Sequence, residues 1–196
     1  LMELRLPAVY GIGNSVLYFI DRYGDHDLYD VDFRYFDGVE RRPQGVGLDL
    51  LDHLTHNVER GNMDVWSDFY ERIANFKQIR YFDIEGKQTG LFSRAMTSPC
   101  GKLRIPINES ADDKSQIEEF LRQYRGEGIQ HLALSTRDIY KTVEALRARG
   151  VVFMDTPDTY YDRIDARLPQ HAESVARLKA QIADLLDILS KPERVT

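Results

Sequence analysis

The sequence predicts an α+β fold made of two related strand–helix units, the second of which is incomplete. The first observation is a repeat: an apolar strand that carries a histidine, followed by an amphipathic helix, occurs around His53 and again around His131. The second observation is that the two units differ in length: three strand-like segments follow the helix of the first unit, and only one follows the helix of the second. Such a repeat predicts two pseudo-symmetric halves with both imidazoles facing one pocket.

The first unit has the order β-α-β-β-β. An apolar stretch at 48–58 predicts its first strand, and Gly61-Asn62 precede a predicted helix over 63–76. This helix is indicated by residues at the i, i+3, i+4 and i+7 spacing of one face, namely Trp66, Phe69, Tyr70 and Ile73. Turn residues then separate three predicted strands at 78–84, 88–97 and 103–107.

The second unit begins in the same way and then stops. After a predicted helix over 114–124, a strand at 129–135 and a helix over 138–149 repeat the first pattern. The sequence next predicts a short strand, a turn and a long helix, at 151–154, 156–161 and 170–190. Two further strands would complete the sheet of this unit, and the pattern provides neither.

Residues 1–47 are less regular than the rest of the chain. A β-like run at 16–20 is followed by a polar stretch over 21–43 that has few aliphatic residues and little periodicity. We therefore interpret this part as one terminal strand and a long linker.

Composition excludes several classes of function. The formal net charge of −6, without a basic cluster, argues against a nucleic-acid partner. No apolar run approaches the ~18 residues of a membrane span. The single cysteine, Cys100, excludes an internal disulfide and a cysteine-based zinc site. These features predict a cytoplasmic protein.

Two of the five histidines are candidate metal ligands. His53 and His131 occupy the same place in the repeat, whereas His26 and His171 lie in polar segments and are expected to be ordinary surface residues. Because side chains alternate along a strand, His53 and His56 must point to opposite faces, and only His53 should face the pocket. Two facing imidazoles provide two of the three protein ligands of a non-haem iron site.

Seven segments carry a family resemblance: GVGL (45–48), DHLTHN (52–57), RYFDI (80–84), RIPINE (104–109), SQIEEF (115–120), GEGIQH (126–131) and PDTYY (157–161). Together they resemble the bacterial 4-hydroxyphenylpyruvate dioxygenases of the vicinal-oxygen-chelate superfamily, over roughly residues 7–178. The resemblance implies glyoxalase-like βαβββ modules. It also implies that 1–47 form the end of an N-terminal domain with its linker, that 48–196 form a C-terminal catalytic domain, and that the chain is truncated at both ends.

The same resemblance implies an activity and a site. The family converts 4-hydroxyphenylpyruvate and O2 to homogentisate and CO2 in tyrosine catabolism, and full-length members are expected to be homo-oligomers. His53 and His131 match its Fe(II) ligands, and Ser93, Asn108 and Gln116 match polar positions near the substrate. Asn108 favours this reading over the related 4-hydroxymandelate synthase, which tends to carry an apolar residue there.

The third ligand of the family is a glutamate on a late strand in a Phe-Phe-Glu context, and this sequence contains no such segment. Glu173 and Glu193 are the late glutamates, and we expect neither to bind iron. Three interpretations stay open: a truncated dioxygenase, a non-catalytic binding module that keeps the pocket, and an enzyme whose missing carboxylate comes from a partner chain or is replaced by water.

Overall fold

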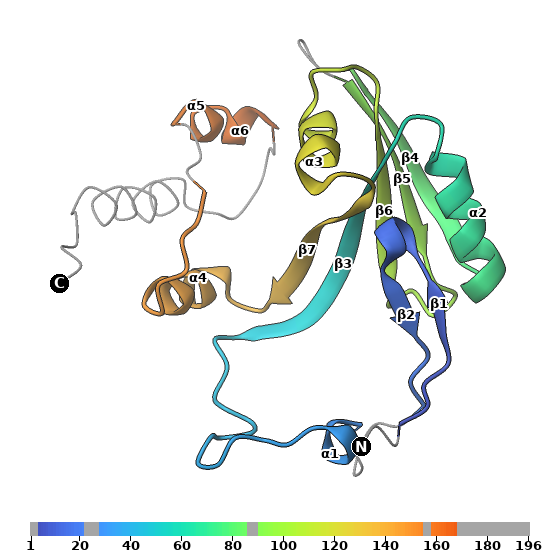
Figure 1. The fold of residues 1–196 in the computed structure, drawn as a ribbon. Helices are drawn as coiled ribbons and strands as arrows, with labels where there is room; N and C mark the ends of the chain where they lie inside the picture. Colours follow the sequence, from blue (N-terminus) through green and yellow to red (C-terminus); the bar gives the residue numbers. More distant parts are fainter. Residues whose placement is uncertain (1–3, 22–27, 86–89, 155–157, 168–196) are drawn as a thin grey trace. The chain divides into compact units, whose positions relative to one another are not determined.

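A computed structural model describes residues 4–21, 28–85, 90–154 and 158–167 (Figure 1). The chain divides into two compact units, Leu1–Asp138 and Ile139–Thr196, which are described separately. Within the described residues, no helix has both the length and the apolar character needed to cross a membrane.

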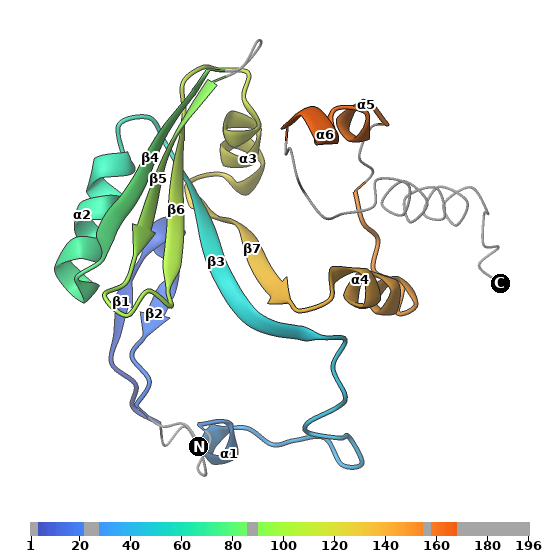
Figure 2. The same cartoon turned by 180° about the vertical axis from the view of Figure 1, so that it is seen from behind.

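The first unit is built on a five-stranded sheet with the strand order β4-β5-β6-β3-β7 (Figures 1 and 2). The predicted β-α-β-β-β unit is confirmed, and each of its elements lies within about three residues of its predicted bounds. The five elements of this unit are β3 (Leu48–Val58), α2 (Met63–Ala74), β4 (Lys77–Glu85), β5 (Gly90–Thr97) and β6 (Arg104–Ser110). The helix α3 (Gln116–Tyr124) and the strand β7 (Gly128–Thr136) follow it in the chain and also lie close to their predicted bounds.

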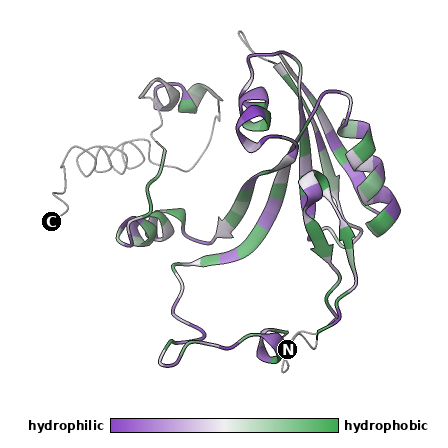
Figure 3. Ribbon diagram, viewed as in Figure 1, coloured by the Kyte–Doolittle hydropathy of each residue, from purple (hydrophilic) through white to green (hydrophobic). Residues whose placement is uncertain are grey.

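One face of the sheet carries the hydrophobic core. Val58, Met96 and Ile107 from three neighbouring strands pack there against Tyr70 of α2, and all four are buried. Polar and apolar residues follow one another along the strands and around α2, as the alternation of a half-buried sheet requires (Figure 3). Removing one such large side chain from water stabilises the fold by about 1.5–3 kcal/mol, so this face provides much of the stability of the unit.

An N-terminal hairpin completes the core. It consists of β1 (Ala8–Tyr10), a 3-10 turn (Ile12–Asn14) and β2 (Val16–Tyr18), and its Ile12 is buried in the same cluster. The sequence predicted one strand here rather than two, because three residues at 8–10 are too few to show a period. A short helix, α1 (Tyr29–Asp32), lies in the stretch interpreted as a linker.

Strand β3 separates from β6 along most of its length. The two pair in parallel over three residues only, His56–Val58 with Ile107–Glu109. By contrast, β3 pairs with β7 from Leu48 to Asn57, with register shifts at three places. Among the described strands, the stretch of β3 that carries His53 therefore has backbone pairing with β7 alone.

The second unit contains α4 (Ile139–Arg147), α5 (Asp158–Tyr161) and α6 (Ile164–Arg167). The strand predicted at 151–154 is wrong: these residues are irregular, with Val152 71% and Met154 94% exposed, and β-branched residues form a strand only where a neighbour can pair with them. The turn predicted at 156–161 is wrong over its described residues, 158–161, because they form the single helical turn α5. The helix predicted over 170–190 lies outside the described residues.

Candidate metal and substrate site

The structure brings His53 and His131 together on neighbouring antiparallel strands. His131 of β7 lies opposite Thr55 of β3, and residues opposite one another in such a pair project from the same face. His53 precedes Thr55 by two residues and shares that face. The two imidazole centroids are 5.6 Å apart, with the rings inclined at 73°.

Each imidazole is held through its Nδ1 atom by the residue before it. Nδ1 of His53 lies 2.8 Å from Oδ2 of Asp52, and Nδ1 of His131 contacts Oε1 of Gln130. An oxygen acceptor at Nδ1 favours the tautomer with the proton on that atom, which leaves the Nε2 lone pair available. Thr55 Oγ1 lies 2.9 Å from His131 Nε2, where its hydroxyl can donate to the lone pair of that atom, so a metal ion bound there would replace this hydrogen bond.

The donor set fits a divalent metal ion. Neutral imidazoles oriented by a carboxylate or an amide oxygen on the far nitrogen are typical metal ligands. Burial, and then the neighbouring His53, lower the pKa of His131 and so favour its neutral form. The pKa of Asp52 is lowered as well, first by the hydrogen bond from His53 and then by the charge of Arg104, with which it forms an ion pair.

The resemblance implies three protein ligands, and the described residues include the two histidines expected for the first two positions. Over the described ranges, no group of three or more His, Cys, Asp or Glu side chains is placed to hold a metal ion. The two glutamates considered for the third position, Glu173 and Glu193, lie outside these ranges, as does His171.

His56 lies on the opposite face, as strand alternation predicted. It is 1% exposed, its Nε2 atom lies 2.7 Å from the Tyr70 hydroxyl, and burial lowers its pKa to about 4. Burial likewise raises the pKa of Tyr70 to about 12. His56 is therefore a neutral core residue that ties β3 to α2.

Two of the three predicted substrate residues, Ser93 and Asn108, lie on the face of the sheet that carries His53. Ser93 of β5 is opposite Asn108 of β6, and Asn108 is level with Asn57 of β3, so these side chains form a polar row across three strands. Gln116 is the first residue of α3. A cavity of about 500 Å³ is lined by Asn57, Asn108, Gln116 and Gln130, among others, and Ser93 is not among its lining residues.

Sequence reasoning missed two of these lining residues. Asn57 lies four residues beyond His53, so alternation alone places it on the same face, and the pattern could have revealed it. Gln130 lies next to His131 in β7, where strict alternation would turn it to the opposite face. A register shift in the β3–β7 pairing between Thr55 and His56 disturbs that alternation, and the sequence carries no signal of it.

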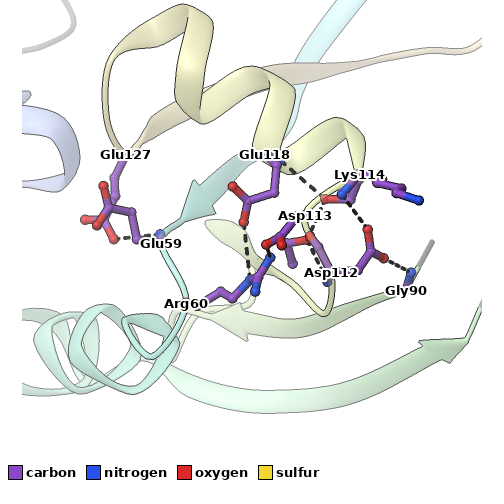
Figure 4. Close-up of polar contacts among 10 residues, drawn as sticks. Glu59, Arg60, Gly90, Asp112, Asp113, Lys114, Glu118 and Glu127 are labelled. Carbon is purple, nitrogen blue, oxygen red and sulfur yellow. Dashed lines mark hydrogen bonds and ion pairs between the residues drawn. The ribbon is translucent and has the colours of Figure 1, made fainter.

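The loop before α3 fixes the position of Gln116. Asp112 accepts hydrogen bonds from the backbone N–H groups of Gly90 and Lys114, both at 2.7 Å (Figure 4). Ser115 caps the helix by accepting from the Glu118 N–H at 3.3 Å. Arg60 pairs with Asp113 and with Glu118, which joins the end of β3 to this loop.

A second anchor fixes the approach to β7. The Glu127 carboxylate accepts hydrogen bonds from the Glu59 N–H, the Asn62 side-chain amide and the Trp66 indole, at 2.7–2.9 Å (Figure 4 shows the Glu59 contact). Because Glu127 is four residues before His131, this anchor sets where the strand with the second histidine begins.

Comparisons with known proteins identify the family of the chain. The sequence profile of the Glyoxalase/Bleomycin resistance protein/Dioxygenase superfamily matches residues 50–164, and that of the N-terminal part of hydroxyphenylpyruvate dioxygenase matches residues 1–34. The chain is 68% identical to Hemolysin VllY of Vibrio vulnificus over 180 residues, which are 91% of this chain and 50% of that protein. It is 66% identical to 4-hydroxyphenylpyruvate dioxygenase of Pseudomonas aeruginosa over 177 residues, 90% of this chain and 50% of the relative.

Solved structures give the same picture. A xylose isomerase-like TIM barrel/4-hydroxyphenylpyruvate dioxygenase fusion protein superposes with a TM-score of 0.66 and 31% identity, over 91% of this chain and 27% of that one. A mutant of 4-hydroxymandelate synthase from Streptomyces coelicolor gives a TM-score of 0.61 and 29% identity, over 69% of this chain and 39% of that one. The chain spans about half the length of the two curated relatives named above. The chain thus belongs to the glyoxalase/bleomycin resistance protein/dioxygenase superfamily, and within it to the group of the 4-hydroxyphenylpyruvate dioxygenases.

Proposed function

We propose that this chain forms the two-histidine part of an Fe(II) dioxygenase that converts 4-hydroxyphenylpyruvate and O2 to homogentisate and CO2. The observation that carries the proposal is the pair His53 and His131, 5.6 Å apart on adjacent strands, each oriented through Nδ1 by a side-chain oxygen. The relatives named 4-hydroxyphenylpyruvate dioxygenase support the choice of substrate.

The residues have separate tasks in this proposal. His53 and His131 would hold the metal through Nε2, while Asp52 and Gln130 keep the imidazoles in the tautomer that can bind it. Bound Fe(II) would supply the activation of O2 and the oxidative decarboxylation of the α-keto acid. Ser93, Asn108 and Gln116 would hold the phenol through hydroxyl and amide groups, which do not compete with imidazole for the metal.

The test is oxygen uptake by the intact chain, reconstituted anaerobically with Fe(II) and then given 4-hydroxyphenylpyruvate and O2. We expect uptake with formation of homogentisate, and loss of both in His53→Ala and in His131→Ala. Unchanged uptake in either variant would refute the ligand assignment. A folded chain that takes up no oxygen would contradict the activity.

A non-catalytic binding module is the second candidate. It is favoured by a specific observation, because the described residues contain no group of three His, Cys, Asp or Glu side chains placed to hold a metal ion. In that case the chain would bind the aromatic α-keto acid without consuming oxygen. Calorimetric binding of 4-hydroxyphenylpyruvate without turnover would decide for it.

A 4-hydroxymandelate synthase activity is the third candidate, since one such enzyme is a structural neighbour. The two activities share the substrate and differ in where oxygen enters, so the product identifies the enzyme. We expect homogentisate, because Asn108 places a polar group in the cavity. 4-Hydroxymandelate as the main product would reverse this assignment.

A further inference from the structure

Asn57 stands out among the polar residues of the cavity because part of it is buried without a partner. The residue is 3% exposed and lines the cavity with Asn108 and Gln116. Its Oδ1 atom is shielded from solvent and has no hydrogen-bond partner in the described part of the chain. Buried polar atoms in folded proteins are nearly always paired, so an exception of this kind needs an explanation.

The fold itself does not provide that explanation. Asn57 lies within the three-residue parallel pairing of β3 and β6, and its neighbours Val58 and Ile107 are fully buried. An apolar residue would fit the demands of stability at this position better than an amide whose oxygen is unpaired. A polar group retained at such a cost is typical of a functional site.

The neighbours of Asn57 show what it can recognise. It completes the row Ser93–Asn108–Asn57 on the face of the sheet that carries His53 and His131. An amide oxygen accepts hydrogen bonds, so its partner must be a donor. Of the groups of an ionised aromatic α-keto acid, only the phenol hydroxyl can donate, because the carboxylate and the keto oxygen are acceptors.

We propose that Asn57 is a specificity-determining residue whose amide turns when the ligand binds, so that Oδ1, shielded from solvent in the free chain, accepts a hydrogen bond from the 4-hydroxyl of the aromatic substrate. This inference rests on the proposed function for the class of ligand. It adds a residue that distinguishes hydroxylated from unhydroxylated aromatic α-keto acids. A site built to pair with a hydroxyl rejects the analogue that lacks it, since a buried group is then left unpaired.

The experiment compares two ligands, 4-hydroxyphenylpyruvate and phenylpyruvate, by anaerobic calorimetry on the intact chain with Co(II) present. Both ligands carry the same α-keto acid, so any contribution of the metal cancels in the ratio of their dissociation constants. We expect the wild-type chain to prefer the hydroxylated ligand. Asn57→Leu should lower this preference about tenfold, mostly through weaker binding of 4-hydroxyphenylpyruvate.

Thermal unfolding separates this role from a structural one. Asn57→Leu should keep or raise the Tm, because it removes a buried unpaired oxygen. The matched control is Asn62→Leu, which removes an amide that donates to Glu127 at 2.7 Å; it should lower the Tm and leave the ligand preference unchanged. If Asn57→Leu does not fold, Asn57→Ala provides the same comparison.

The outcomes distinguish this inference from the proposed function. An unchanged ligand preference in the Asn57 variants would overturn the role of Asn57 while leaving the proposed function standing. Equal affinity of the wild-type chain for both ligands would do the same. Binding of neither ligand by the folded wild-type chain would overturn the proposed function, and the inference with it.

Discussion

On the face of the sheet covered by α2, His56 is buried, neutral and bonded to the Tyr70 hydroxyl among apolar side chains. On the opposite face, three residues away on the same strand, His53 contacts Asp52 and the ring of His131, and nearby Asn57 has an oxygen without a partner in the described residues. The same side-chain type thus serves stability on one face and remains available for a ligand on the other. The two histidines differ in their neighbours: α2 supplies the Tyr70 hydroxyl to His56, whereas β7 places the ring of His131 beside His53.

The largest expected effect is on metal binding by the two facing histidines. His53→Ala and His131→Ala should each weaken Co(II) binding by more than about a hundredfold, since ligands matter more than the residues that orient them. Calorimetric titration with Co(II) measures this. Tight binding retained in either variant would show that the open face does not hold the metal through both imidazoles.

The second effect tests the covered face through pH. The pKa of His56 is about 4 in the folded chain and 6.5 when exposed, so the unfolded state binds more protons between these values. His56 should therefore cost no stability above pH 6.5 and about 3 kcal/mol as the pH falls towards 4. Urea unfolding at pH 7.5 and pH 4.5 measures the loss, which His56→Gln should reduce. An equal loss in that variant would place the sensitivity elsewhere.

The third effect concerns the hydrogen bond between the Asp52 carboxylate and His53 Nδ1. Asp52→Ala removes the acceptor at His53 Nδ1 and should weaken Co(II) binding about 10–100-fold. Asp113→Ala removes a comparable exposed partner of Arg60, away from the histidines, and should leave binding unchanged. Imidazole nitrogen NMR adds a direct readout, because His53 should lose its preference for the Nδ1–H tautomer only in the first variant. Identical imidazole spectra in the Asp52→Ala and Asp113→Ala variants would show that Asp52 does not set the tautomer of His53.

The smallest effect on the metal should come from Asn108→Leu. Asn108 lines the cavity, and its strand partner is Ser93 rather than a histidine. The affinity for Co(II) should therefore change less than about twofold. The rate or the product distribution of the reaction should change. Product analysis with a parallel metal titration checks this. Loss of the metal would indicate that Asn108 supports the sheet rather than the ligand.

Much of this arrangement could be predicted from the sequence because it depends on periodicity. The bounds of β3 follow from its apolar run, the face of α2 from its i, i+3, i+4 spacing, and the opposite directions of His53 and His56 from strand alternation. The repeat also places His53 and His131 at equivalent positions, and the structure brings their two rings into contact. That both imidazoles face one pocket stays a prediction. Their roles as metal ligands stay a prediction.

The remainder depends on tertiary contacts that leave no local pattern. Asp52 can contact its neighbour His53 because the β3–β7 register shifts between Leu51 and His53, which breaks the strict alternation of side chains. The unpaired oxygen of Asn57 is a property of its surroundings and not of its neighbours in sequence. The segment 151–154, wrongly expected to be a strand, has the composition of one but pairs with no strand among the described residues.

The short seam between β3 and β6 has a mechanical consequence. The ribbon of β3 and β7 carries both histidines, whereas Ser93 and Asn108 belong to the block formed by β4, β5 and β6, and backbone pairing joins the two bodies over three residues only. A flexing of this seam would leave the spacing between the imidazoles unchanged and would alter their distance from Asn108. The seam, more than any single side chain, therefore sets the distance between the two histidines and the Ser93–Asn108 pair. A ligand whose α-keto acid lies at the histidines and whose phenol lies at Asn108 must match this distance.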